Sequence, residues 1–85
     1  MSQLTVFSKN GCAGCVAVAQ HFDRIGVNYK AVKIDENEAA MAFFRAAGHR
    51  SVPQIYTPDG TVLASSLMDV LKLSACMLDA FKVQT

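Results

Sequence analysis

Hydrophobic and polar positions along the chain predict two parallel strands joined by a helix in its first part. Residues 3–8 are nearly continuous in apolar and β-branched side chains, as in a central strand covered on both faces. In residues 28–34, positions 29, 31 and 33 alternate with positions 30, 32 and 34, and this period of two predicts a second strand. Residues 13–25 repeat apolar positions at steps of three and four, which predicts a helix between the strands that ends at Gly26. The inward stripe of this helix contains Cys15, Val18, Phe22 and Ile25.

A second helix is predicted after the second strand. Asp35 and Glu38 have the spacing of a capping box, which marks a helix start, and Gly48 is placed to end the helix. Its apolar face is expected to contain Ala40, Met41, Phe43, Phe44 and Ala47.

The last part of the chain predicts a β-hairpin and a terminal helix. Residues 53–57 and 61–64 predict antiparallel strands around a turn formed by Pro58, Asp59 and Gly60. Ser66, with Asp69 three positions later, predicts the N-cap of a helix whose apolar stripe runs from Val70 to Phe81. Cys76 lies one position off that stripe, and we interpret it as a small, half-buried hydrophobic residue.

These elements follow the order βαβαββα, which predicts an α/β fold with a four-stranded mixed sheet and helices on both faces. At 85 residues, 52% of them hydrophobic, the chain is expected to form a single domain over residues 1–85. No linker, repeat or low-complexity tract interrupts the pattern.

Composition narrows the range of partners. The formal net charge is +1 and only 8% of the residues are aromatic, so there is no electrostatic footprint for nucleic acid. No apolar run is long enough to span a membrane, and no charged and apolar leader follows Met1. Three cysteines, an odd number, do not suit a secreted disulfide scaffold. We therefore expect a cytoplasmic monomer that binds a protein or a small molecule, with no nucleic acid, membrane or bound cofactor.

Cys12 and Cys15 carry the chemistry that the sequence indicates. Cys12 falls at the start of the first predicted helix, where unpaired backbone N–H groups and the helix dipole favour a thiolate. Cys15 lies one turn later, facing inward, and is close enough to attack a mixed disulfide formed at Cys12. This arrangement predicts dithiol–disulfide exchange, with Cys12 as the attacking thiol and Cys15 as the resolving one.

Two segments resemble the glutaredoxin family, whose fold is thioredoxin-like. One is Ser8-Lys9-Asn10-Gly11-Cys12-Ala13-Gly14-Cys15, which opens the first helix, and the other is Gly48-His49-Arg50-Ser51-Val52-Pro53-Gln54-Ile55-Tyr56, which enters a strand. The chain also resembles the small glutaredoxin-like hydrogen donors of ribonucleotide reductase, with a lysine three positions before the first cysteine and the step Gly26-Val27-Asn28-Tyr29. The resemblance spans most of the chain.

The resemblance implies a substrate-binding surface beside the cysteines. It implies a cis peptide bond between Val52 and Pro53, whose backbone would pair with an extended substrate. Lys9 and Arg50 would attract a carboxylate, and Lys9 would also stabilise a thiolate. At the start of the last helix, Ser66 and the nearby N–H groups would hold a second carboxylate. Asp69 matches the second of two acids that glutathione-using members carry there.

The choice of electron donor stays open at this stage. Glutathione-using members usually have proline and an aromatic residue between the cysteines and a glycine pair before the last helix, whereas this chain has Ala13-Gly14 and Ser65-Ser66. The resemblance implies glutathione as reductant and disulfide-containing proteins such as ribonucleotide reductase as partners. The alternatives are a redoxin driven by thioredoxin reductase, a Cu(I) carrier of the βαββαβ fold, and iron–sulfur cluster binding between two copies.

Overall fold

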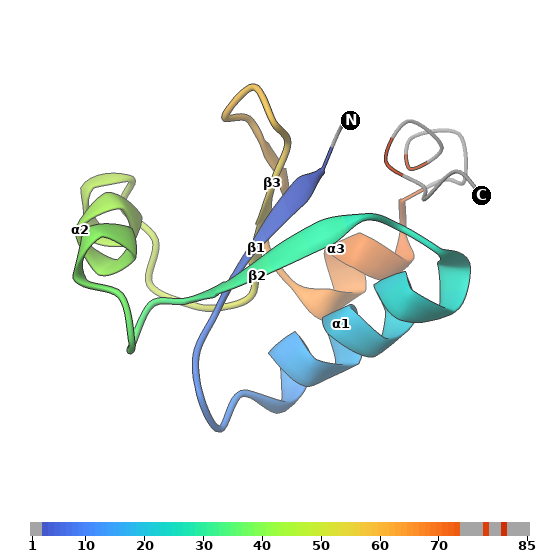
Figure 1. The fold of residues 1–85 in the computed structure, drawn as a ribbon, viewed down its shortest axis with the longest axis horizontal. Helices are drawn as coiled ribbons and strands as arrows, with labels where there is room; N and C mark the ends of the chain where they lie inside the picture. The colour runs from blue at the N-terminus through green and yellow to red at the C-terminus, as the bar shows by residue number, and fades with distance from the viewer. Residues whose placement is uncertain (1–2, 74–77, 79–80, 82–85) are drawn as a thin grey trace.

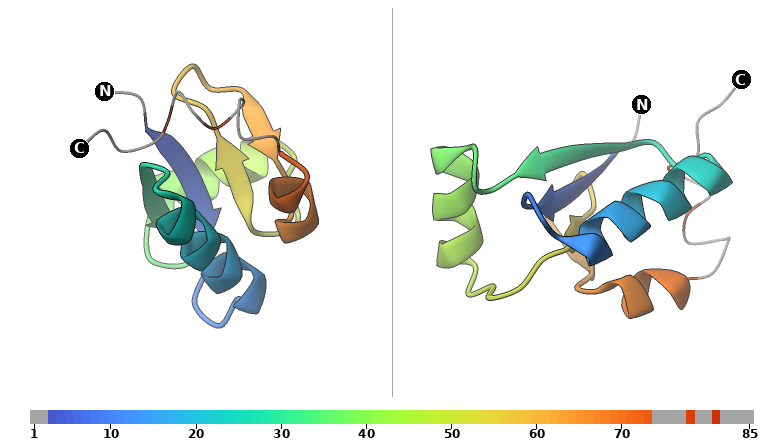
Figure 2. Two further views of the ribbon diagram at one scale, coloured as in Figure 1. Left: turned by 90° about the vertical axis from the view of Figure 1, so that its right-hand side faces the viewer. Right: turned by 90° about the horizontal axis from the view of Figure 1, so that it is seen from below.

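Four strands form one mixed sheet with helices on both of its faces in the computed structural model, which describes residues 3–73, 78 and 81 (Figures 1 and 2). The strands and helices follow one another along the chain in the predicted order βαβαββα. The strands are β1 (Leu4–Ser8), β2 (Tyr29–Lys33), β3 (Gln54–Tyr56) and β4 (Val62–Ala64). The helices are α1 (Ala13–Ile25), α2 (Glu38–Ala46) and α3 (Leu67–Leu71).

The sheet has the strand order β2-β1-β3-β4, so β1 is central as predicted. β1 pairs in parallel with β2, with Leu4 opposite Tyr29, and antiparallel with β3. β3 and β4 form the predicted antiparallel hairpin. β2 lies at one edge of the sheet, where Lys30 and Lys33 are exposed. The central strand β1 ends at Ser8, and the loop after it leads to Cys12 at the start of α1.

Two hydrophobic cores lie on opposite faces of the sheet. Because successive side chains of a strand point to opposite faces, Val6 enters one core and Phe7 the other. Figure 2 shows α1 and α3 on one side of the strands and α2 on the other. The buried residues of the core under α1 and α3 are Leu4, Val6, Val18, Phe22, Val27, Ile55, Ala64, Val70 and Leu78. Those of the core under α2 are Phe7, Ile34, Ala40, Phe44 and Tyr56.

The start of α2 differs from the prediction. Asn37, and not Asp35, is the N-cap, and its side-chain oxygen accepts a hydrogen bond of 3.0 Å from the backbone N–H of Ala40. Asp35 instead accepts a hydrogen bond from the backbone N–H of Asn10, so its carboxylate belongs to the loop before Cys12. The end of the helix is as predicted, because Gly48 follows Ala47 with a φ of 81°.

Phe43 is more exposed than the apolar pattern of α2 indicates. Phe44 is buried, whereas Phe43 keeps 47% of its surface exposed. The ring of Phe43 nevertheless stacks on Phe7, with 5.5 Å between the ring centroids, and meets Tyr56 edge-on. Phe43 thus covers the outer margin of the core on this side of the sheet.

The last predicted helix is described only in part, at residues 67–73, 78 and 81. Ser66 is its N-cap as expected, but α3 ends at Leu71, and Lys72 and Leu73 form a turn and a bend. Leu73 and Phe81 pack against the core under α1 and α3, and the helical Leu78 is buried in it. Cys76, within residues 74–77, lies outside the described residues. Across the described part of the chain, no helix combines the length and the apolar character needed to cross a membrane.

Leu4→Ala should lower the free energy of unfolding by roughly 3–5 kcal/mol, because it leaves a cavity in the middle of the core. Leu4 is fully buried in the central strand. Leu71→Ala is the matched control, because Leu71 is 54% exposed and its truncation should cost no more than about 0.5 kcal/mol. Urea unfolding of the two oxidised variants measures the difference, and equal losses would contradict the assignment of the core.

Candidate active site

Cys12 is the N-cap of α1. Its backbone is extended (φ −96°, ψ 104°), and its Sγ accepts a hydrogen bond of 3.1 Å from the backbone N–H of Cys15. That N–H is one of the donors that the first turn of a helix leaves without a partner. A thiolate accepts such a bond better than a thiol does, so the position stabilises the ionised form of Cys12 after reduction.

Cys12 and Cys15 form a disulfide, and their Cα atoms lie 5.3 Å apart. The two sulfurs differ in access. Cys12 is half-buried, whereas Cys15 retains 6% of its surface and belongs to the inward side of α1 with Val18 and Phe22. As predicted, the first cysteine is the one that a substrate can reach, and the second one is sheltered behind it.

The loop before β3 lies against the cysteines. The predicted cis peptide bond between Val52 and Pro53 is present. The carbonyl oxygen of Val52 lies 4.0 Å from Sγ of Cys12. A β-carbon at Gly14 would stand 3.7 Å from Cδ of Pro53, so the first turn of α1 and this loop are in contact range. The fold therefore brings the predicted site residues Val52 and Pro53 to the disulfide.

Gln54 supports this loop from behind. Gln54 is only 3% exposed, and its Nε2 donates a hydrogen bond of 2.9 Å to the carbonyl oxygen of Ser51. Its Oε1 is buried and has no partner within residues 3–73, 78 and 81. The sequence analysis did not single out Gln54; the available signal was an amide at a position directly followed by the apolar strand residues Ile55 and Tyr56.

Lys9 and Arg50 are exposed on the two segments that meet at the disulfide. Lys9 follows β1 and stands three positions before Cys12, and Arg50 stands two positions before Val52. Neither side chain has a hydrogen bond or an ion pair within the part of the chain that the structure describes. Both cations are free to meet an anion, and their binding role stays a prediction.

Ser66 and Asp69 cap α3. The hydroxyl oxygen of Ser66 accepts a hydrogen bond of 3.1 Å from the backbone N–H of Asp69. The carboxylate of Asp69 accepts one of 3.2 Å from the backbone N–H of Ser65. These bonds account for both residues without a ligand, and the part of Ser66 and Asp69 in substrate binding stays a prediction.

The order of elements rules out the fold of a Cu(I) carrier. A βαββαβ chain has two consecutive strands after its first helix, whereas α2 lies between β2 and β3 here. Among the described residues, no group of three or more His, Cys, Asp or Glu side chains is placed to hold a metal ion. Cys12 and Cys15 are bonded to each other.

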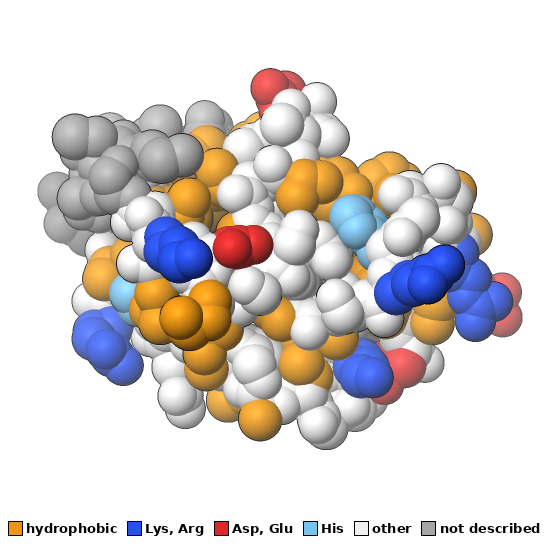
Figure 3. Space-filling view, turned by 180° about the vertical axis from the view of Figure 1, so that it is seen from behind, with side chains coloured by type: hydrophobic (Ala, Val, Ile, Leu, Met, Phe, Trp, Pro, Cys, Tyr) orange, Lys and Arg blue, Asp and Glu red, His pale blue; other side chains and the backbone are white. Residues whose placement is uncertain are grey.

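Charge on the face opposite that of Figure 1 is mixed. Basic side chains lie toward the two ends of this face, with acidic ones beside them and hydrophobic ones between them (Figure 3). This pattern agrees with the formal net charge of +1. The described residues on this face therefore form no continuous basic stripe of the kind that tracks a phosphate backbone.

Comparison with known proteins points to one family. A sequence model described as glutaredoxin matches residues 4–63. Human mitochondrial glutaredoxin-2 is 31% identical over an alignment of 67 residues, which covers 74% of this chain and 40% of the human protein. The chain thus spans less than half the length of this curated relative.

Solved structures agree with the fold. The chain resembles buckwheat glutaredoxin in its complex with glutathione, with a TM-score of 0.67, 27% identity, and coverage of 84% of this chain and 66% of that one. It also resembles the glutaredoxin-like NrdH-redoxin from Escherichia coli, described as having a thioredoxin-like activity profile. That match has a TM-score of 0.70 and 22% identity, and it covers 86% of this chain and 97% of the other.

The two glycines beside Cys12 should respond in opposite ways to alanine. Gly11 has a φ of 76°, so Gly11→Ala should lower the free energy of unfolding by about 1 kcal/mol. Gly14 is helical, and its new methyl group would meet Pro53 at an ordinary 3.7 Å, so Gly14→Ala should raise stability by up to about 1 kcal/mol. Thermal unfolding of the oxidised variants tests this pair, and a loss for Gly14→Ala would contradict the described packing.

Proposed function

Since the chain belongs to the glutaredoxin family, we propose that it is a thiol–disulfide oxidoreductase that reduces disulfides through Cys12 and Cys15. The observation that carries this proposal is the disulfide at the first turn of α1, with the carbonyl oxygen of Val52 4.0 Å from Sγ of Cys12. A reactive sulfur at a helix start and an open backbone segment beside it are what disulfide exchange requires.

The first step is attack by Cys12. Its thiolate attacks one sulfur of the substrate disulfide, a mixed disulfide between Cys12 and that half of the substrate forms, and the other half leaves as a thiolate. The N–H of Cys15 that bonds to Sγ of Cys12 favours the ionised nucleophile at this step. The backbone at Val52 is placed to hold the substrate beside the sulfur.

The second step is attack by Cys15. Its thiolate attacks Sγ of Cys12, the intramolecular disulfide forms, and the second half of the substrate leaves as a thiolate. Two electrons have then passed from the dithiol to the substrate, and the leaving thiolates take protons from solvent. The 5.3 Å between the Cα atoms allows the disulfide to close.

Cys12→Ser should abolish disulfide reduction, because the attacking sulfur is gone, while serine still serves as a helix N-cap. Cys15→Ser should accumulate a mixed disulfide with a protein substrate, because resolution is blocked. Turnover of a model disulfide measures the first effect, and mass spectrometry of the unreduced protein measures the second.

Cys76→Ser is the control for the loss of a thiol, and it should retain the activity of the unaltered chain. Turnover by Cys12→Ser, or a mixed disulfide held on Cys76, would refute the assignment of Cys12 as nucleophile. Circular dichroism of each variant separates a loss of chemistry from a loss of fold.

The reductant we propose is glutathione, and the recipient of the electrons we propose is a disulfide-containing protein such as ribonucleotide reductase. Glutathione carries two carboxylates, and Lys9 and Arg50 are exposed cations without partners among the described residues. Lys9 is three positions before Cys12, and Arg50 is two positions before Val52. Support also comes from the buckwheat glutaredoxin, which was solved in complex with glutathione. The recipient is proposed because Lys9, three positions before Cys12, and the step Gly26-Val27-Asn28-Tyr29 resemble the hydrogen donors of ribonucleotide reductase.

Glutathione with glutathione reductase should drive turnover at the expense of NADPH. Lys9→Ala and Arg50→Ala should each raise KM for glutathione roughly two- to fivefold with little change in kcat, the size of an exposed charge pair of about 0.5–1 kcal/mol. Lys30→Ala removes an equally exposed cation from the edge strand β2 and is the matched control.

Thioredoxin reductase in place of glutathione and its reductase is the opposing arm of the same assay. Turnover only in that arm would reject glutathione as the reductant while leaving the exchange chemistry intact. Turnover in neither arm would reject the oxidoreductase assignment itself.

A further inference from the structure

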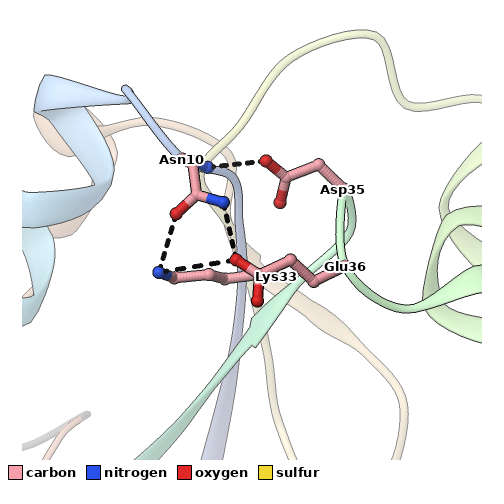
Figure 4. A network of polar contacts seen from close by, with 4 residues as sticks. All are labelled: Asn10, Lys33, Asp35 and Glu36. Carbon is pink, nitrogen blue, oxygen red and sulfur yellow. Dashed lines mark hydrogen bonds and ion pairs between the residues drawn. The ribbon is translucent and has the colours of Figure 1, made fainter.

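Asn10 connects the loop before Cys12 to the turn between β2 and α2 (Figure 4). Its backbone N–H donates a hydrogen bond of 3.0 Å to Oδ2 of Asp35, and its Nδ2 donates one of 2.6 Å to Oε2 of Glu36. Its Oδ1 accepts a hydrogen bond of 2.8 Å from Nζ of Lys33, which also lies 3.8 Å from Oε2 of Glu36. We refer to these four residues, Asn10, Lys33, Asp35 and Glu36, as the Asn10 clamp.

The clamp acts on a very short segment. The carbonyl oxygen of Ser8, the last residue of β1, accepts a hydrogen bond of 2.8 Å from the backbone N–H of Ile34. Cys12 already belongs to α1 as its N-cap. Only Lys9, Asn10 and Gly11 lie between these two anchors, so fixing Asn10 fixes the middle of the segment.

We propose that Asn10 and Asp35 are positioning residues, which hold Cys12 at the start of α1 within bonding range of Cys15 and so favour closure of the disulfide. This inference rests on the proposed function, since it concerns the same pair of cysteines. Closure requires Sγ of Cys12 to remain near Cys15, and a free three-residue segment would spend more time elsewhere. The clamp thereby raises the effective concentration of one thiol at the other.

Variants of Asp35 can distinguish an effect of positioning from an effect of charge on the disulfide equilibrium. Asp35 accepts a backbone N–H, and an asparagine oxygen can accept the same bond without the negative charge. Asp35→Asn should therefore behave like the unaltered chain, whereas Asp35→Ala should not. If the carboxylate acted on the thiols by its charge, both variants would change the disulfide equilibrium alike.

The test is the equilibrium between the dithiol and the disulfide in a glutathione redox buffer, read by mass spectrometry after alkylation. Asn10→Ala and Asp35→Ala should each lower the equilibrium constant for closure roughly three- to tenfold, the factor expected when a hydrogen bond of the clamp is lost. Asp59→Ala is the matched control, since Asp59 is an exposed aspartate that accepts the backbone N–H of Thr61 in the distant hairpin turn.

Thermal unfolding of each variant distinguishes positioning from general stability. Equal losses of stability for Asp35→Ala and Asp59→Ala, with closure unchanged in both, would overturn the proposal and leave the clamp a structural feature. A shift in closure for Asp35→Asn as large as for Asp35→Ala would overturn it in favour of charge.

If the unaltered chain forms no reversible disulfide, the proposed function fails, and the inference fails with it. If the unaltered chain forms its disulfide normally and only the equilibrium constants of the variants differ from those expected, the inference alone is rejected.

Discussion

The active site depends on one hydrogen bond, in which the backbone N–H of Cys15 binds Sγ of Cys12. The first turn of any helix has N–H groups that need an acceptor, and here a sulfur atom supplies it. The same bond that completes α1 therefore stabilises the nucleophile when it is ionised. Among the described residues, Cys12 supplies the side chain that caps the start of α1, so formation of the helix also brings this N–H to the sulfur.

The surroundings of that bond come from three distant parts of the chain. β1 leads to Cys12, the Val52–Pro53 loop lies in front of the sulfur, and the turn after β2 holds Asn10. Pairing of the central strand β1 with both β2 and β3 brings these segments together, since it fixes where each neighbouring strand begins or ends. The sheet thus acts as the frame of the site, and the two cores on its faces keep that frame rigid.

Much of this arrangement could be predicted from the sequence, because it follows from local patterns. The spacing of Cys15, Val18 and Phe22 predicted both the helix and the buried side of it, and these residues are buried as expected. Contacts between side chains of distant segments could not be predicted in the same way. Asp35 has the spacing of an N-cap, yet its carboxylate accepts a hydrogen bond from the backbone N–H of Asn10 in the loop before Cys12. Asn37 caps α2 instead.

The end of α3 shows the same limit, since the helix ends at Leu71 and Lys72 and Leu73 form a turn and a bend. No glycine or proline marks this bend, at which Leu73 packs against the core. For Gln54 the local signal, an amide directly before Ile55 and Tyr56, does not reveal its role, because that role lies in the hydrogen bond to the carbonyl oxygen of Ser51. Sequence periodicity reports which face is apolar, but tertiary contacts decide where an element stops.

The edge strand β2 affects how the molecule behaves toward its own kind. An edge strand presents unpaired backbone groups that can template pairing with another chain, and such pairing leads to aggregation. Here Lys30 and Lys33 are exposed along β2, and a second copy pairing there would bring like charges together. Among the described residues, these lysines therefore disfavour edge-to-edge pairing of two copies along β2.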